Sequence, residues 1–482
     1  MTGSYLIKGA TVVSVDPAIG IVNNCDVLIK EGFIAAVGPD IAALPDSTII
    51  DGTDAIVSPG FVDTHRHTWQ TQLRTITADY VLSDYFVNIR NIWGSCYTAQ
   101  DAYIGNYCGA LESVDNGITF LIDHSHIMNS PEHADAAVRG LKNANIRAIF
   151  CYGLYENPFW EGSCIDRELG EKNPNWRRED AKRIKKTYFA SNQPTDLIRF
   201  GFAPAEIERG TIEQAVDEVE FGRSLNSAII TGHVAMGKYD RGVHLIRHFQ
   251  ERNMLGPDLL LSHCASLQDD ELVAAGKNGV SFSSTPDTEL QMGMGHPIAF
   301  KARKYGCCAS IGIDITSNNP ADMFQQMRLL IQAQRHLENE SHDGPRASIT
   351  QRCAEVLEMA TMGGAEAVGL KDVIGSITPG KRADLLITRC DSTRLTPVHD
   401  PVAALVLYAN GSDIDSVFVD GKLLKSGGRL VGVDWPKVRG ELRDSARAIM
   451  ERSTKAPRER IEKAALAVMK GLREKEEPKI KL

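Results

Sequence analysis

Five residues of types that bind transition metals stand at the ends of β-rich runs in this sequence: His65, His67, His233, His263 and Asp314. Because His65 and His67 lie two residues apart in one run, their imidazoles point to the same side of a strand. Imidazole nitrogens and carboxylate oxygens are natural ligands of a divalent transition metal. A single histidine at a strand end is usually a structural residue, but five such residues together predict a metal site.

The runs that end in these residues belong to a longer alternation of strands and helices. Eight runs in the middle of the chain have the composition of buried strands: 56–67, 118–126, 146–155, 198–204, 228–234, 259–264, 280–284 and 307–314. One intervening helix opens with Ser130, Pro131 and Glu132 as N-cap, first helical proline and acidic first turn. This alternation predicts an α/β fold, a TIM-type (β/α)8 barrel with its chemistry at the C-terminal strand ends.

Both ends of the chain are rich in short strands separated by Gly, Pro and Asp. The runs are 5–7, 11–15, 27–29 and 33–37 near the start, and 383–388, 403–408, 414–419 and 422–424 near the end. We expect them to form one small β-sandwich domain from residues 1–58 and 375–430. The barrel would then span residues 59–374, and residues 431–482 would form a C-terminal helical extension.

The composition excludes several classes of protein. The chain has 482 residues and a formal net charge of -9, which argues against binding to nucleic acid. No run of about 18 apolar residues predicts a membrane span, and no signal peptide is visible, so we expect a cytoplasmic protein. The ten cysteines form no CxxC motif, which indicates free thiols.

Several motifs resemble those of one enzyme superfamily. The segment 59–67, PGFVDTHRH, is similar to the first-strand signature of the amidohydrolase superfamily, in the branch of the cytosine, guanine and adenosylhomocysteine deaminases and the triazine hydrolases. Ser262-His263-Cys264, Gly312-Ile313-Asp314 and the segment 375–385 resemble later motifs of this branch. The resemblance extends over nearly the whole chain and implies a homo-oligomer.

The resemblance also implies roles for the five residues. His65, His67, His233 and Asp314 would hold one divalent metal, with zinc as the default and iron or manganese as alternatives. The metal would activate a water molecule, Asp314 would accept its proton, and His263 would hydrogen-bond a substrate or hydroxide oxygen. Some relatives bridge two metals with a lysine on the fourth strand, but the run 198–204 contains no lysine.

One position departs from the pattern of these deaminases. They usually carry His-x-x-Glu on the fifth strand, whereas this sequence has Met236 three residues after His233. Since the glutamate protonates a departing amine, its loss favours chloride or hydrosulfide as the leaving group, for example from a hydantoin-like thione. Other groups could replace the acid or contact the substrate: Glu289, His126, Glu206, Gln70 and Trp69. For each of them a packing role remains the alternative.

These observations predict a metal-dependent hydrolase that acts on a small heterocyclic substrate. Activated water would attack a ring carbon in a desulfuration, a dechlorination or a deamination. Two alternatives remain open, a metal-dependent lyase or decarboxylase on the same barrel and a noncatalytic binding relative. Fold analogy alone cannot choose the substrate.

Overall fold

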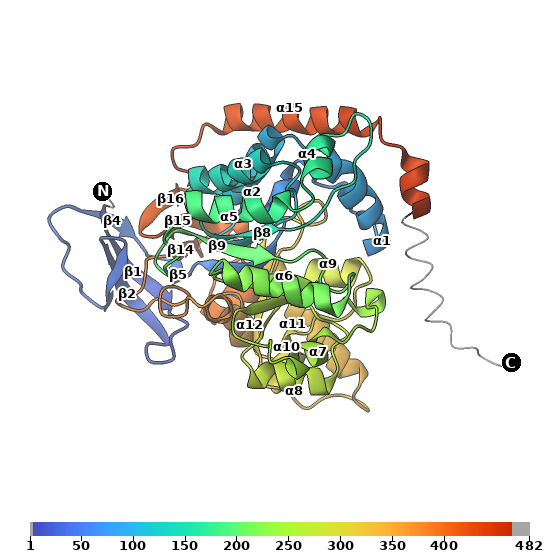
Figure 1. Cartoon of the computed structure of the whole chain (residues 1–482). Helices are drawn as coiled ribbons and strands as arrows, with labels where there is room; N and C mark the ends of the chain where they lie inside the picture. The colour runs from blue at the N-terminus through green and yellow to red at the C-terminus, as the bar shows by residue number, and fades with distance from the viewer. Residues whose placement is uncertain (1–2, 465–482) are drawn as a thin grey trace.

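The computed structural model describes residues 3–464, which form a barrel and an adjoining β-sheet (Figure 1). The barrel contains eight strands, in sequence order β6 (Phe61–Arg66), β7 (Ile118–Ser125), β8 (Arg147–Gly153), β9 (Ile198–Ala203), β10 (Ile230–Val234), β11 (Leu259–His263), β12 (Ser281–Ser284) and β13 (Cys308–Ile311). Neighbouring strands pair in parallel. A parallel bridge between Arg66 and Asp314 brings the first strand beside the last. The predicted barrel is confirmed.

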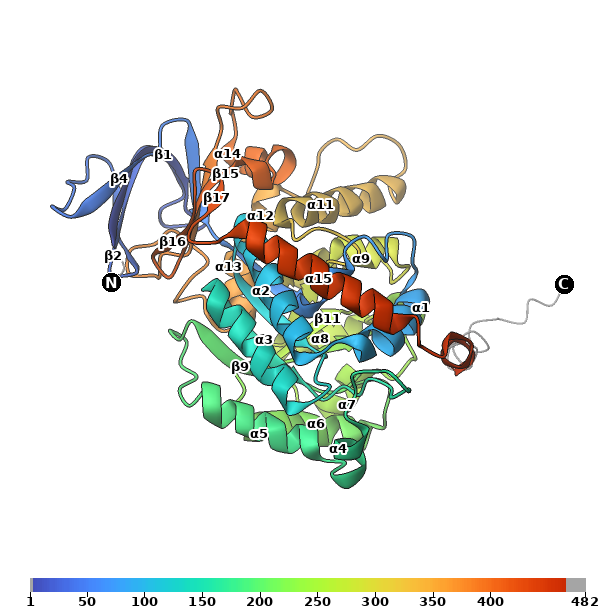
Figure 2. The same cartoon turned by 90° about the horizontal axis from the view of Figure 1, so that it is seen from above.

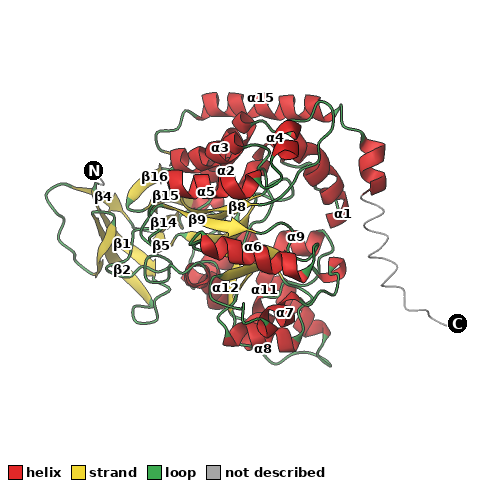
Figure 3. Ribbon diagram, in the orientation of Figure 1, coloured by secondary structure: helices red, strands yellow, loops and turns green. Residues whose placement is uncertain are grey.

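Helices surround the barrel strands, as Figure 3 shows in red and yellow. They include α2 (Ala99–Asp115), α3 (Pro131–Ala144), α5 (Trp176–Tyr188), α6 (Ile212–Ser224), α7 (Leu245–Glu251), α8 (Asp269–Lys277), α10 (Ala299–Lys304) and α11 (Met323–Glu340). Because helices cover one face of each strand and the barrel interior covers the other, a strand such as β7 is buried along its whole length.

The two ends of the chain join in one mixed sheet of nine strands. The early strands are β1 (Ser4–Val13), β2 (Ile21–Lys30), β3 (Phe33–Gly38), β4 (Ser47–Asp51) and β5 (Ala55–Pro59). The late strands are β14 (Leu385–Arg389), β15 (Ile414–Val419), β16 (Lys422–Ser426) and β17 (Arg429–Leu430). Antiparallel pairing of β14 with β5 unites the two halves. The β domain built from both termini is therefore present, and the exact domain limits stay a prediction.

Several predicted strands differ in the structure. The runs 5–7 and 11–15 are joined in the single strand β1. The run 56–67 is divided at Gly60 into β5 of the terminal sheet and β6 of the barrel. A Cβ atom at Gly60 would lie 2.1 Å from Thr119 Oγ1, so only glycine allows this close passage. The run 403–408 is helical, because Asp400 caps the backbone N–H groups of a turn that begins with Pro401.

The C-terminal part contains a helix, as predicted for 431–482. Helix α15 (Trp435–Ser453) lies across α2 in Figure 2. Residues 465–482 of that predicted extension lie outside the described part of the chain. Among residues 3–464, no helix combines the length and the apolar character needed to cross a membrane. All ten cysteines lie in this part and are free.

Candidate active site

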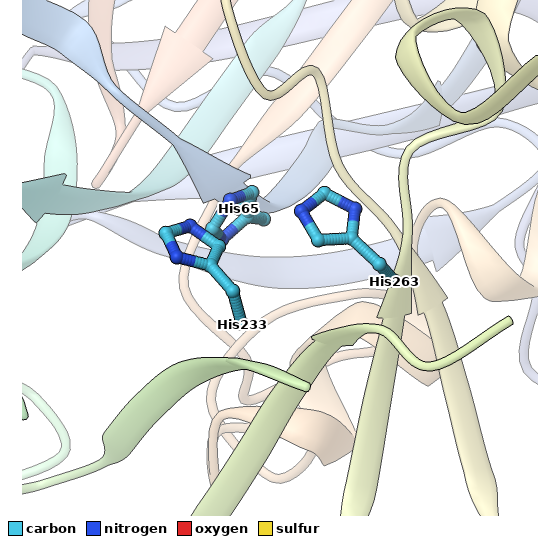
Figure 4. A group of neighbouring side chains, drawn as sticks. All are labelled: His65, His233 and His263. Carbon is cyan, nitrogen blue, oxygen red and sulfur yellow. The ribbon is translucent and has the colours of Figure 1, made fainter. Parts of the chain in front are cut away.

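The structure brings the five predicted residues together at the C-terminal ends of the barrel strands. Nε2 of His65 and Nε2 of His67 each lie 3.5 Å from Oδ1 of Asp314. Nε2 of His233 lies 3.3 Å from Nε2 of His67. Donor atoms of His65, His233 and His263 also lie within 4.8 Å of one another, and Figure 4 shows these three side chains converging.

Backbone geometry at the strand ends directs two of these side chains. His263 and Asp314 have φ angles of 71° and 69°, which non-glycine residues rarely adopt. The Asp314 backbone is held on both sides, since its N–H donates to His65 O and its carbonyl accepts from His67 N–H, each at 2.8 Å. Such strained conformations cluster at functional sites, where the surrounding structure enforces them.

Hydrogen bonds of the Nδ1 atoms orient the rings of His65 and His67. Nδ1 of His67 donates to the carbonyl oxygen of His124 at 2.8 Å, which leaves the lone pair on Nε2 facing Asp314. Nδ1 of His65 lies 2.7 Å from Ser262 Oγ. Buried Nε2 of His65 has no hydrogen-bond partner among the described residues. This arrangement resembles metal-binding histidines, whose outer nitrogen is fixed by a hydrogen bond.

The electrostatics of the cluster suit a cation. Burial lowers the pKa of His65 to about 4 and that of His67 well below its ordinary value, so both rings stay neutral. Burial works against ionisation of Asp314, but contact with His65 holds the pKa of its carboxyl well below the usual range. Neutral imidazoles and one carboxylate form a donor set for a divalent metal. The residues present therefore fit the metal that the sequence predicts.

His263 is oriented from behind by Glu289. Nδ1 of His263 lies 3.1 Å from Thr285 Oγ1 and 3.4 Å from Glu289 Oε1. Burial of His263 acts to lower its pKa, but the hydrogen bond to Glu289 acts the other way, and the pKa of His263 is raised. Glu289 itself accepts the Thr285 N–H at 2.8 Å and lies behind His263. Glu289 is thus absent from the lining of the small inner cavity beside the cluster, and its contact with a substrate stays a prediction.

Two cavities adjoin the cluster. The inner one has a volume of about 20 Å³, enough for a single water molecule. Its lining includes Met236, His126 and Glu206. Next to it lies an outer pocket of about 670 Å³, which shares Phe86, Arg90 and Glu206 with the inner cavity.

Two other predicted substrate contacts lie behind the cavity wall. Trp69 is fully buried and donates its indole N–H to His126 Nδ1 at 3.0 Å. Gln70 is also fully buried and donates to Tyr85 Oη at 2.7 Å. The short helix η1 (Thr68–Leu73), which follows the metal-site pair, packs these side chains into the core. They support residues that line the cavity.

His126 does line the inner cavity, and its tautomer is determined by its neighbours. Its Nδ1 lies 3.0 Å from the indole nitrogen of Trp69 and 3.1 Å from Nη1 of Arg90. Both of these groups can only donate, so Nδ1 accepts. A neutral His126 therefore carries its proton on Nε2, which can donate to a ligand. Its ring stacks on that of His67 with centroids 4.0 Å apart.

Several lining residues were not found by sequence reasoning. Tyr85, Phe86 and Arg90 come from the adjoining helices α1 (Leu82–Tyr85) and η2 (Phe86–Trp93). They follow no strand, so no local signal marked them. Glu206 is one of the candidate replacements for the missing acid, and its Oε2 lies 3.4 Å from His233 Nδ1. Despite burial, His233 lowers the pKa of Glu206 far below its ordinary value.

Curated relatives match the chain along most of its length. A 5'-deoxyadenosine deaminase of Methanosarcina barkeri is 28% identical over 451 residues, which cover 93% of this chain and 98% of the relative. A 5-methylthioadenosine/S-adenosylhomocysteine deaminase of Desulforudis audaxviator is 28% identical over 460 residues, which cover 92% and 99%.

Solved structures share the fold. An adenosine deaminase from Xanthomonas campestris with bound zinc has a TM-score of 0.79 at 21% identity, covering 93% of this chain and 98% of that one. A zinc complex of atrazine chlorohydrolase from Arthrobacter aurescens has a TM-score of 0.75 at 19% identity, covering 92% and 100%. The model of the amidohydrolase family matches residues 56–424. This chain is therefore an enzyme of the amidohydrolase family.

Proposed function

We propose that this enzyme hydrolyses a small heterocyclic compound with one divalent ion held by His65, His67, His233 and Asp314. The observation that carries the proposal is the buried cluster, in which two neutral imidazoles lie 3.5 Å from an ionised carboxylate. Zinc is the default ion, since solved structures of the same fold contain it. When bound, such an ion lowers the pKa of water toward 7 and so supplies a nucleophile.

The protein's own groups would move the proton and orient the attack. Asp314 stays ionised and can take a proton from the attacking water as its oxygen bonds to a ring carbon. His263, held by Glu289 on its Nδ1 side, directs its other nitrogen to the same centre. The Nε2–H of His126 can donate a hydrogen bond to a ring nitrogen or to the leaving atom.

We infer the leaving group from Met236, which lines the inner cavity and stands where the deaminases that the sequence resembles usually carry a glutamate. A general acid contributes about 10²- to 10⁴-fold to the expulsion of an amine. Chloride leaves without a proton, and hydrosulfide nearly so. We therefore infer that the enzyme replaces chloride or a thioxo sulfur by oxygen, releasing chloride or hydrosulfide.

Deamination is the second candidate, and two observations favour it. The curated relatives named above are deaminases. Glu206 lines the inner cavity, and its ionised carboxylate could take the proton of the attacking water and pass it to the leaving amine, which Met236 cannot do. Matched rings that bear amino, chloro or thioxo groups decide between the candidates. If the amino ring is turned over fastest, and Glu206→Gln removes that turnover, deamination replaces our first assignment.

Hydrolysis itself is tested with solvent water labelled with oxygen-18. The expected result is one labelled oxygen in the product for each turnover, because the nucleophile comes from water. A lyase or decarboxylase would release product without the label. Turnover without incorporation would therefore overturn the proposed hydrolysis, whichever group leaves.

A further inference from the structure

The outer pocket contains an unusual arginine. Arg90 is only 7% exposed and lines both cavities. Its Nη1 donates to His126 O at 3.2 Å and to Asn157 Oδ1 at 3.1 Å, which are uncharged groups. Within residues 3–464, no carboxylate oxygen lies within 4.0 Å of its guanidinium. A buried charge without a close counter-ion is costly and suggests that an anionic ligand completes the site.

A second arginine lies beside it. The Arg209 guanidinium stacks on the Phe86 ring at 4.1 Å from its centroid, and both residues line the outer pocket. In the described part of the chain Arg209, too, has no carboxylate within 4.0 Å. The other arginines of this pocket differ, because Arg177 pairs with Glu156 at 3.2 Å and Arg178 pairs with Asp217.

The arginines lie close to the metal-binding residues. Nη1 of Arg90 is 3.1 Å from Nδ1 of His126, and the His126 ring stacks on His67 at 4.0 Å. One imidazole ring thus separates Arg90 from a predicted metal ligand. A single small molecule can therefore contact both the cluster and the arginines.

We propose that Arg90 and Arg209 form an anion subsite that holds a carboxylate substituent of the heterocyclic substrate, an inference that rests on the proposed function. The outer pocket, at about 670 Å³, has the volume of a small-molecule site. Guanidinium groups bind carboxylates through paired charge-assisted hydrogen bonds. The substituent would lie in the outer pocket while the ring reaches the inner cavity.

The charged side chains of the outer pocket favour a ligand with a single negative charge. Its lining has four arginines, Arg90, Arg177, Arg178 and Arg209, against three glutamates, Glu156, Glu206 and Glu218. Arg177 and Arg178 are already paired with Glu156 and Asp217, so Arg90 and Arg209 are the arginines left to hold an anion, and the ionised Glu206 lines the pocket beside them. A phosphate ester with two negative charges would be repelled by Glu206 more strongly than a monocarboxylate would.

The experiment compares two planar probes, 3-phenylpropionate and 3-phenylpropionamide, by calorimetry on the zinc-loaded enzyme. Arg90→Met and Arg209→Met should each weaken binding of the acid by about 10- to 100-fold, the value of a charged hydrogen bond. Binding of the amide should hardly change. Arg178→Met is the matched control, because this arginine lines the same pocket but already has an acidic partner.

The outcomes separate this proposal from the proposed function. Equal affinities of the parent enzyme for acid and amide, or no binding of either, would overturn the anion subsite. The same holds if acid binding survives both arginine substitutions but is lost in His65→Ala, since the carboxylate would then bind the metal. Arginine-dependent acid binding without hydrolysis of any ring would support the subsite and refute the proposed function. Because Arg209 is exposed, its variant should fold even if Arg90→Met does not.

Discussion

At the scale of single residues, each side chain of the cluster is held by a partner behind it. His67 is fixed by a backbone carbonyl, His65 by Ser262 and His263 by Thr285 and Glu289. Side chains locked in this way lose little entropy when a metal or a substrate binds. The residues behind the cluster should therefore affect activity even though they do not line the cavity.

The first prediction concerns metal binding. His65→Ala and His233→Ala should each lose most of the metal, because each removes one of four expected ligands. His133→Ala is a control outside the cluster, since both ring nitrogens of His133 are hydrogen-bonded, one to Ser130 and the other to the Tyr97 carbonyl. Elemental analysis after purification gives the metal content per chain. Full occupancy in both variants would refute the ligand assignment.

The second prediction separates His263 from the metal ligands. His263→Asn should keep most of its metal and lose activity by about 10²-fold or more, the scale of a proton-transfer or electrostatic group. Glu289→Gln should cause a smaller loss, because it only weakens the orientation of the ring. Metal content and kcat are measured on the same samples. If His263→Asn loses its metal together with its activity, His263 is a metal ligand.

At the scale of elements, the C-terminal half of α11 is tied to the loop that follows it. Glu338 accepts hydrogen bonds from Gln334 at 2.9 Å, Arg346 at 2.6 Å and Thr350 at 2.8 Å. Burial opposes ionisation, but these bonds lower the pKa of Glu338 to about 2, from an ordinary value of 4.5. The ionised carboxylate thus fastens residues 346–350 to the helix.

The third prediction follows from this pKa. A lowered pKa in the folded state adds stability above pH 4.5 that is lost as the pH falls toward 2. Glu338→Gln should therefore lower the free energy of unfolding by about 1 to 2 kcal/mol at pH 7. The difference from the parent should shrink below pH 4.5 in urea titrations. Glu340→Gln, on the exposed side of the same helix, is the control, and an equal effect there would contradict the role of Glu338.

At the scale of the whole molecule, a buried ion pair joins the barrel to the terminal sheet. Arg147 begins β8 and is almost fully buried. Its guanidinium donates to Asp384, which precedes β14, at 3.1 Å and to Asp420, which follows β15, at 2.7 Å. Contact with the two carboxylates raises the pKa of Arg147 even though burial opposes it. The pair thus links strands from distant parts of the chain.

The fourth prediction tests this link. Arg147→Met should destabilise the protein by about 3 to 5 kcal/mol, because it leaves a buried carboxylate without its partner. The variant should keep the metal, since Arg147 lies at the opposite end of β8 from the cluster. Melting temperature and metal content are the measurements. Arg447→Met, which breaks an exposed ion pair with Asp444, is the control and should cost much less.

Much of the fold could be predicted from the sequence, because each barrel strand is a short apolar run with its own local pattern. The five cluster residues could be chosen for the same reason. A parallel barrel places all of its strand ends on one face, so residues at strand ends become neighbours without knowledge of the loops. The run 403–408 was wrongly predicted as a strand, since a buried apolar run fits a helix as well as a strand.

The tertiary structure alone decided which side chains line the cavity. Trp69 and Gln70 directly follow the metal-site pair, yet packing turns both into the core. Arg90 and Phe86 carry no sequence signal, but the fold places their helix over the strand ends. The physical reason is that strand ends obey a regular geometry, whereas the placement of loops and short helices depends on contacts between residues far apart in the sequence.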